Sequence, residues 1–325
     1  MDAQRELLCC MFTFDVPTTT HVCYETIFGR DLAPHTIQHL QRLSMSNSQM
    51  KIILESHNQC RYIRPVVQDY LMRLCALKQS LKRAQHDGYA VRVASSPQFS
   101  WTSALEEKDA FHVDHSYSNP TISFQLVQTL FTFAVAGNAN DAPRMLWDAL
   151  SIDEKNFNDI VTEVKSRLLT AAGILQYIIK DILPQWKARP GADSAGGGGN
   201  AAAAAATAAG PTPGRPRSTT ARTTTTSTAT RVSIPLECCP KFLEALSFMF
   251  EAQAYQVNVA LTARNSTKKE VLARICLGIT KRYQQALAAL NTTDPNGLLL
   301  IDRVRPSLRM YVSFLPSFLL CSSSS

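Results

Sequence analysis

IVTEVKSRLLTAAGILQYIIKDI, residues 160–182, is the stretch that decides the fold. Its apolar residues recur at steps of three and four, which is the spacing of one face of an α-helix. Pro184 predicts the end of that helix. The stretch therefore predicts a long helix that buries one continuous stripe, made of Ile160, Val164, Leu168, Ala171, Leu175, Ile178 and Ile182.

Similar stripes lie on both sides of this stretch and predict further helices. Asn119 and Pro120 predict a cap and a first-turn proline before one of them, and Thr267 with Glu270 forms a capping box before another. The helices show no strict repeat, so the sequence predicts an all-α core of irregular stacked antiparallel helices. The stripes are 63–81 (Ile63, Val67, Tyr70, Leu74, Leu77, Leu81), 124–134 (Phe124, Val127, Leu130, Phe131, Ala134), 242–261 (Phe242, Leu246, Met249, Phe250, Ala252, Ala254, Val257, Leu261) and 271–290 (Val271, Ile275, Ile279, Tyr283, Ala286, Leu290).

Two stretches have the alternating pattern of β-strands. Residues Met11–Val16 alternate toward Pro17, and Tyr89–Val93 alternate after the turn signal Asp87-Gly88. Together they predict a small antiparallel sheet near the N-terminus.

One segment, residues 189–231, differs in composition from the rest of the chain. It consists mainly of Ala, Gly, Thr, Ser and Pro, and it contains no aromatic residue, which predicts a disordered insertion. It carries five arginines and one aspartate, so it holds +4 of the chain's net charge of +7 and leaves +3 for the other residues. This distribution disfavours nucleic-acid binding, which needs a basic folded face. It gives only weak support to a peripheral membrane contact.

The chain has 325 residues, 45% of them apolar, which is within the range of globular proteins. Its longest apolar run, Met310–Cys321, is too short to span a bilayer, and the acidic residues near the N-terminus disfavour a secretory signal. The nine cysteines include no CxxC pair, which favours free buried thiols in a cytoplasmic protein.

Catalytic signals are few. The phosphate-loop, dinucleotide, serine-hydrolase and zincin motifs are absent from the sequence. His35 and His39 share a helix face, but Thr36 stands where a metalloprotease needs Glu, so a solvated pair is expected. His112–His115 is interpreted as a polar turn rather than a metal site. We therefore predict no enzyme activity, no cofactor and no metal.

Partner binding has better support. Stacked helix pairs leave a curved surface that accepts an amphipathic helix through apolar anchors. The predicted helix after Lys268 places Val271 and Ile275 one turn apart, with the bases Arg274 and Lys281 nearby. If no other part of the chain covers this face, it suits a ligand helix whose apolar stripe is flanked by acidic residues. The alternative is that both residues belong to the core.

Six motifs follow one another along the chain. They are FSWTSAL (99–105), the apolar helix 123–136, AAGIL (171–175), EAQAYQ (251–256), the stretch 268–275 and YQQA (283–286). Their order and spacing resemble the Bro-one domain, the boomerang-shaped helical domain with a TPR-like solenoid core of Alix-type and Brox-type endosomal adaptors. The resemblance implies a non-enzymatic cytoplasmic scaffold at endosomes that binds the C-terminal amphipathic helix of filament subunits of the third ESCRT complex, of the Snf-seven or charged multivesicular body protein class.

Aligned without gaps, three pocket positions of the family fall on Asn258, Val271 and Ile275. Alix-type members have an aromatic residue where this chain has Asn258. We expect one Bro-one-like domain over residues 1–325, interrupted by residues 189–231 and shortened at the C-terminus, where the family continues through further helix pairs. A helical-repeat module with a different partner is the alternative.

Overall fold

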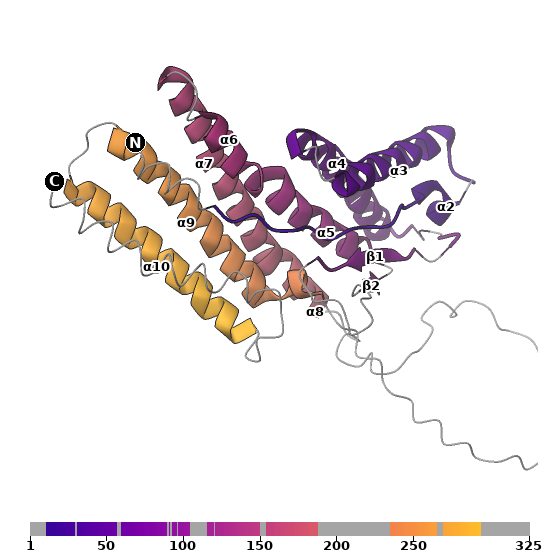
Figure 1. Cartoon of the computed structure of the whole chain (residues 1–325). Helices are drawn as coiled ribbons and strands as arrows, with labels where there is room; N and C mark the ends of the chain where they lie inside the picture. The colour runs from indigo at the N-terminus through magenta and orange to yellow at the C-terminus, as the bar shows by residue number, and fades with distance from the viewer. Residues whose placement is uncertain are drawn as a thin grey trace, which may run out of the picture.

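The computed structural model is a stack of antiparallel helices with one two-stranded sheet (Figure 1). It describes residues 11–29, 31–56, 60–89, 91, 93–95, 97–104, 116–119, 121–149, 154–187, 235–264 and 269–293. The α-helices are α2 (Tyr24–Phe28), α3 (Pro34–Glu55), α4 (Cys60–His86), α5 (Ile122–Ala134), α6 (Ala142–Ala149), α7 (Glu154–Tyr177), α8 (Leu183–Lys187), α9 (Pro240–Arg264) and α10 (Lys269–Thr293). Three shorter helical turns are η1 (Val135–Ala139), η2 (Ile178–Ile182) and η3 (Leu236–Cys238).

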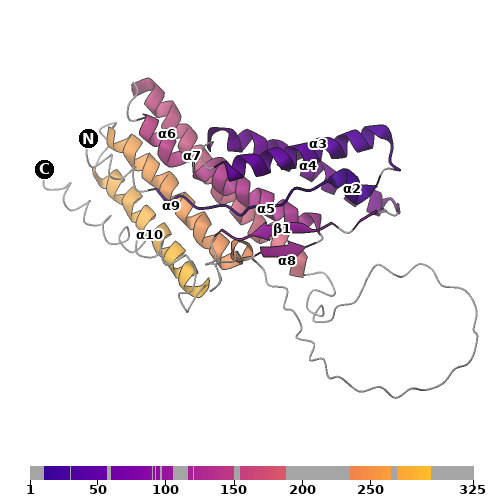
Figure 2. The ribbon, with the colours of Figure 1, turned by 45° about the vertical axis from the view of Figure 1, so that its right-hand side comes forward.

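The helices form two arms that meet at α5 (Figure 2). Helices α3 and α4 pack on each other in the N-terminal arm, and α4 contacts α5. In the other arm α5 packs on α7, α7 on α9, and α9 on α10. The predicted all-α fold of stacked antiparallel helices with a small sheet is therefore confirmed.

The stripe of residues 160–182 is buried as predicted, with only Ile160 partly exposed. The predicted end at Pro184 is wrong, because helical structure continues to Lys187. A π-helical turn, η2, interrupts the α-helix at Ile178–Ile182, and Pro184 is the second residue of the new segment α8. The N–H of Leu183 bonds to the carbonyl of Ile178 across this wider turn, so proline, which has no N–H group, follows a local break in the regular i to i−4 pattern.

The cap before α5 lies two residues later than predicted. Thr121, not Asn119, is the N-cap, and its Oγ1 accepts a hydrogen bond from the backbone N–H of Phe124 at 3.3 Å. The Asn119 carboxamide oxygen instead accepts from the N–H of Thr121 at 2.9 Å. Asn119 thus supports the capping residue without capping the helix itself.

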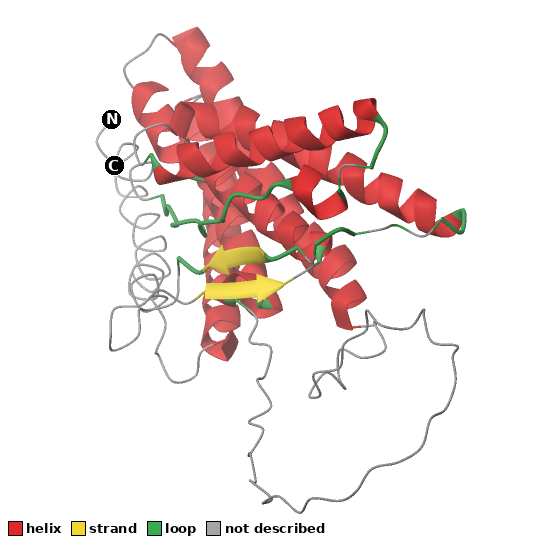
Figure 3. Cartoon of the chain, turned by 90° about the vertical axis from the view of Figure 1, so that its right-hand side faces the viewer, coloured by secondary structure: helices red, strands yellow, loops and turns green. Residues whose placement is uncertain are grey.

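A small sheet forms, but from other residues than predicted. Strand β1 (Phe99–Thr102) pairs antiparallel with β2 (Ser116–Asn119), and Thr18 adds one isolated bridge to Thr102 (Figure 3). Strand β1 buries Trp101 completely, with its ring 5.6 Å from that of Phe124. The sheet therefore covers the start of α5.

Met11–Val16 was predicted to be a strand and is not one. The segment is fixed instead by Asn140, whose side chain accepts from the N–H of Phe14 at 3.0 Å and donates to its carbonyl at 2.6 Å. One carboxamide thus replaces a neighbouring strand. The alternating side chains still pack inward, because Phe12 lies against Tyr283 and Phe14 against Phe250.

The prediction of a strand at Tyr89–Val93 is also wrong for its described residues. Tyr89, Val91 and Val93 are in no strand, because no other described strand pairs with them. Their side chains are all exposed. Their side chains line a cavity instead.

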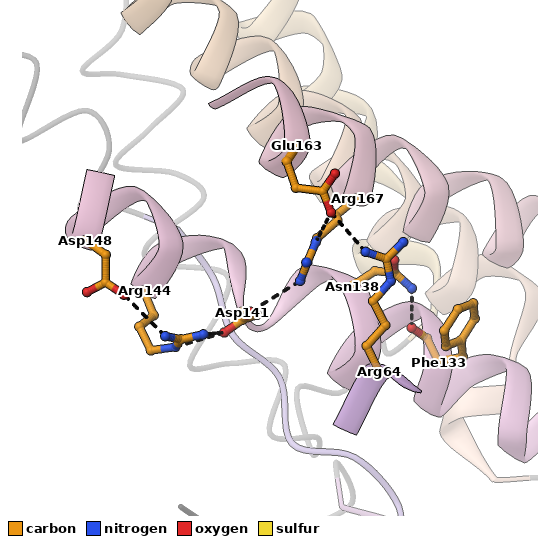
Figure 4. Close-up of polar contacts among 8 residues, drawn as sticks. All are labelled: Arg64, Phe133, Asn138, Asp141, Arg144, Asp148, Glu163 and Arg167. Carbon is orange, nitrogen blue, oxygen red and sulfur yellow. Dashed lines mark hydrogen bonds and ion pairs between the residues drawn. The ribbon is translucent and has the colours of Figure 1, made fainter. Parts of the chain in front are cut away.

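The two arms join where α4 crosses η1. A Cβ atom on Gly137 would lie 2.9 Å from the Phe133 ring and 3.6 Å from the Cα of Arg64, so the helices approach closely at this glycine. Arg64 also crosses the joint, because its guanidinium pairs with Glu163 of α7 at 3.0 Å (Figure 4). Arg167 pairs with the same carboxylate at 2.7 Å.

The ion pairs continue beyond Arg167 to the buried Asp141, at 3.3 Å, and from Asp141 to Arg144 and Asp148 of α6 (Figure 4). Asp141 accepts from two arginines, which compensates for the loss of water around its carboxylate. The network therefore ties α6 to α7 and, through Glu163, to α4.

Several expectations fall outside the described residues. They are the disordered insertion at 189–231, the capping role of Thr267, the polar turn at 112–115 and the shortened C-terminal end. Among the helices that are described, none combines the length and apolar character needed to cross a membrane.

Gly137→Val tests the close approach at the joint. The added side chain meets Phe133 and the α4 backbone, so we expect the free energy of unfolding to fall by about 1–3 kcal/mol. Gly173→Ala on α7 is the matched control, since its Cβ meets nothing within 4 Å and alanine favours the helix. Urea denaturation measures both; equal stability of Gly137→Val and wild type would contradict the close packing.

Glu163→Gln tests the ion pair between the arms. The hydrogen bond from Arg167, followed by that from Arg64, lowers the pKa of the Glu163 carboxyl from 4.5. A lowered pKa contributes stability above 4.5 that is lost as the pH falls through the folded-state value. We expect the variant to lose at most about 1 kcal/mol near pH 7, because the pair is partly exposed, and less near pH 3, where the carboxyl is increasingly protonated.

The measurement is urea denaturation at both pH values, with the exposed Asp159→Asn on the same helix as the control. An equal loss at both pH values would show that the effect is not electrostatic.

Candidate functional site

Helix α9 is enclosed by its neighbours except along one stripe. It packs on α7 and on α10, and most of its side chains are buried. The partly exposed stripe steps by three, four and three residues, which keeps it on one helix face. Lys241 and Glu244 lie on it at the start of the helix. The part that faces α10 consists of Phe248, Glu251, Tyr255 and Asn258, of which Tyr255 is 36% exposed and the others are half-buried.

A second stripe on α10 borders the first. It steps by four, three and four residues and consists of Val271, Ile275, Gly278 and Arg282. Val271 is 42% exposed, Gly278 is exposed, and Ile275 and Arg282 are half-buried. A Cβ on Gly278 would meet no atom within 4 Å, so this position leaves open space on the stripe.

Arg282 fixes how the two stripes face each other. Its Nε lies 2.9 Å from Oε2 of Glu251, and its guanidinium carbon lies 5.5 Å from the centre of the Phe248 ring. Because the helices run antiparallel, moving away from this pair brings Tyr255 level with Gly278 and Asn258 level with Ile275. We call these eight residues of the two stripes the α9–α10 surface.

Buried polar and sulfur groups lie beneath this surface. The Tyr283 hydroxyl donates to the Gln256 carboxamide oxygen at 2.5 Å, and both residues are fully buried. Burial also raises the pKa of the Cys276 thiol, which keeps that thiol neutral. The hydrogen bond links α9 to α10 and resists sliding of one helix along the other.

The α9–α10 surface lies on the side of α9 away from the N-terminal segment. Phe250 contacts Phe14 of that segment, whereas Phe248, two residues earlier, projects about 200° away around the helix. The segment at 11–20 therefore covers one side of α9 and leaves the other uncovered.

The structure brings together all three residues predicted from the sequence. Val271 and Ile275 lie one turn apart on α10, and Asn258 lies level with them on α9. Neither apolar residue is sealed in the core, although the last four members of their predicted stripe are buried. These four are Ile279, Tyr283, Ala286 and Leu290.

Sequence reasoning missed Tyr255 and Gly278 as members of this surface. The spacing of residues 248, 251, 255 and 258 carried a signal, but it includes an acid and an amide and so does not stand out as an apolar stripe. Only the antiparallel pairing with α10 shows that Tyr255 and Gly278 lie at the same level of this surface.

Other candidate sites in the described residues differ in character. His35 and His39 are both exposed, as expected for a solvated pair. No group of three metal-binding side chains occurs among the described residues. A cavity of about 570 Å³ lies in the N-terminal arm, between α2, α4, β1 and the start of α5, with Lys78 and Lys82 in an otherwise mainly apolar lining. It lies apart from the α9–α10 surface.

Comparisons with known proteins identify the fold and nothing finer. No family model matches the chain, and no curated protein matches it in sequence. Among solved structures, the chain is similar to an "ALIX BRO1 CHMP4C complex", with a TM-score of 0.61 and 12% identity over 94% of this chain and 70% of that one.

A structure of ALIX in complex with the SIVmac239 PYKEVTEDL late domain gives a TM-score of 0.60, again at 12% identity, over 94% of this chain and 36% of that one. The chain therefore has a Bro-one-like fold, as the resemblance implied.

Proposed function

We propose that this chain is a non-enzymatic adaptor that binds the C-terminal amphipathic helix of a filament subunit of the third ESCRT complex. The helix would lie on the α9–α10 surface and contact Val271, Ile275 and Asn258. The observation that carries the proposal is the exposure of Val271, an aliphatic residue that the rest of its stripe would have placed in the core. Its support from known proteins is the likeness in fold to ALIX BRO1, whose structure was solved with CHMP4C.

The chemistry of the surface suits an amphipathic helix. Tyr255, Val271 and Ile275 offer aromatic and aliphatic contacts, and Gly278 leaves room for a large side chain of the ligand. Arg274 and Lys281 are exposed on α10 beside this surface, so acids flanking the apolar stripe of the ligand would be attracted. Apolar anchors with complementary charges are the usual means of holding a helix in a groove.

Asn258 is the residue of this surface that contributes least to binding an apolar ligand helix. It lies level with Ile275, where an aromatic side chain would add apolar contact area. Loss of one such anchor from an interface commonly costs 10-fold or more in affinity, about 1–2 kcal/mol. We therefore infer a lower affinity for the ligand than an aromatic residue at this position would give.

The proposal places the protein in the cytoplasm, recruited to endosomes through its ESCRT partner. Residues 1–325 would act as one scaffold, with residues 189–231 as an insertion that leaves the helical stack intact. A direct membrane contact is a minor part of the proposal, because the residues outside the insertion carry a net charge of only +3.

An interaction module with a different partner is the second candidate. The observation that favours it is the Glu251–Arg282 ion pair, which places two charged groups across one end of the surface. A partner that forms hydrogen bonds or ion pairs with these two side chains would be more polar than a leucine-rich helix. The two candidates make different predictions for substitutions on α10 and α9.

Ile275→Asp tests the first candidate. An unpaired carboxylate on the apolar stripe should weaken binding of a peptide with the C-terminal helix of CHMP4C by about 30-fold or more, measured by fluorescence anisotropy. Leu277→Asp is the matched control, because Leu277 is 69% exposed and projects about 200° away from Ile275 on the same helix.

Circular dichroism checks that both variants remain folded. Equal binding by wild type and Ile275→Asp would reject the surface as the docking site. Equal weakening by Leu277→Asp would point to a general charge effect instead.

Asn258→Phe tests the missing aromatic contact. The larger ring would extend the apolar surface beside Ile275, so affinity for the same peptide should rise by about threefold to tenfold. Isothermal titration calorimetry measures the change. Weaker binding by Asn258→Phe would favour the second candidate, in which a polar residue at 258 is part of the recognition.

A further inference from the structure

A cysteine and a histidine form a hydrogen-bonded pair at the surface of the N-terminal arm. The Cys23 Sγ lies 3.1 Å from Nε2 of His21, and the other ring nitrogen of His21, Nδ1, lies 2.7 Å from the Ser48 hydroxyl of α3. Helix α2, which follows Cys23, and the α9–α10 surface lie at opposite ends of the molecule (Figure 1). The proposed docking function therefore makes no use of the pair.

Backbone alternation places the two side chains together. The backbone is extended at Cys23, and the side chains on either side of it, Val22 and the first residue of α2, Tyr24, are buried in the core. The backbone N–H of Val22 donates to Asn47 at 2.9 Å, and that of Tyr24 donates to Ser44 at 2.9 Å, so α3 holds the segment in place. His21 and Cys23, two residues apart, consequently share the outer side.

Ser48 contacts the ring nitrogen of His21 that lies away from Cys23. Ser48 donates its single hydroxyl hydrogen to the carbonyl of Ser44, one turn earlier in α3, at 3.1 Å. With that hydrogen engaged, Ser48 accepts from a hydrogen on Nδ1 of the imidazole, which lies 2.7 Å away, and this tautomer is part of the proposal below. In the neutral ring, Nε2 then has a free lone pair, and this atom faces the Cys23 thiol.

This is the arrangement of a nucleophile, a base and a group that orients the base. We propose that Cys23 is a nucleophilic thiol, activated by His21, that is alkylated by small electrophiles and oxidised to a sulfenic acid by hydroperoxides. His21 is exposed and Cys23 is half-buried, so a small reagent can reach the pair.

The Cys23 thiol, the His21 imidazole and the peroxide together supply all the atoms and electrons that the oxidation requires. Nε2 of His21 takes the thiol proton, and the thiolate attacks one peroxide oxygen, forming the S–O bond as the O–O bond breaks. The sulfur is oxidised to Cys–SOH and the peroxide is reduced. Hydroxide leaves and accepts the proton from His21 to give water; from an organic peroxide the leaving group is an alkoxide, which gives the alcohol. In alkylation by iodoacetamide the S–C bond forms as the C–I bond breaks, iodide leaves, and the proton on His21 passes to solvent.

Three other described thiols have surroundings that oppose this reaction. Burial raises the pKa of the Cys75, Cys238 and Cys276 thiols, and the nearby Glu237 raises that of Cys238 further. The thiolate is the reactive form of cysteine, so these residues should react slowly. Cys75 is the best internal control, because it is half-buried like Cys23.

The test is competitive alkylation of the full-length folded protein. A limiting amount of iodoacetamide is added near pH 7, and peptide mass spectrometry follows each cysteine. We expect Cys23 to be labelled at least about tenfold faster than Cys75. His21→Ala should reduce the rate at Cys23 to the Cys75 level, and Ser48→Ala should reduce it partly, because Ser48 positions the ring. His35→Ala removes another exposed histidine and should change nothing.

A second measurement treats the protein with hydrogen peroxide and traps sulfenic acid with dimedone. The adduct should form at Cys23 in wild type and be reduced about tenfold or more in His21→Ala. Equal labelling of Cys23 and Cys75 in the wild type would overturn the proposal without any variant. An unchanged rate at Cys23 in folded His21→Ala would overturn it as well.

Discussion

The structure depends on the enclosure of α9. This helix packs on α7 and on α10, and the N-terminal segment places Phe14 on a third side. With so many neighbours, its side chains are mostly small or aliphatic, and only one stripe of the helix reaches the surface. The position of α10, and hence the exposure of Val271 and Ile275, follows from this packing. A helix enclosed in this way behaves as a rigid support, which suits a docking surface built on its exposed stripe.

The joint between the arms is the second constraint. Gly137 lets α4 approach η1 closely, and Asn140 holds the N-terminal segment through both atoms of its carboxamide. The ion pairs around Glu163 and Asp141 add contacts between elements that are far apart in sequence. Partly exposed ion pairs contribute little on their own, so the close packing at Gly137 is the stronger constraint on this joint.

The two proposed sites use different physical properties of the same stack. The α9–α10 surface offers apolar side chains that the core leaves uncovered, together with nearby basic residues. The Cys23–His21 pair instead depends on one hydrogen-bond chain from the α3 backbone through Ser48 to the imidazole. Each site is supported by a long helix, so the geometry of its side chains is well defined.

Local spacing in the sequence determined the helices and which of their faces are buried, as the stripe of residues 160–182 shows, because an α-helix is made by contacts three and four residues apart. The order of the motifs also identified the Bro-one fold. Only the tertiary structure decided that Met11–Val16 is held by Asn140 instead of a strand, that Val271 remains exposed, and that Tyr255 lies level with Gly278. Each of these depends on a partner that is distant along the chain or on another helix, and the pattern of a single segment carries no information about such a partner.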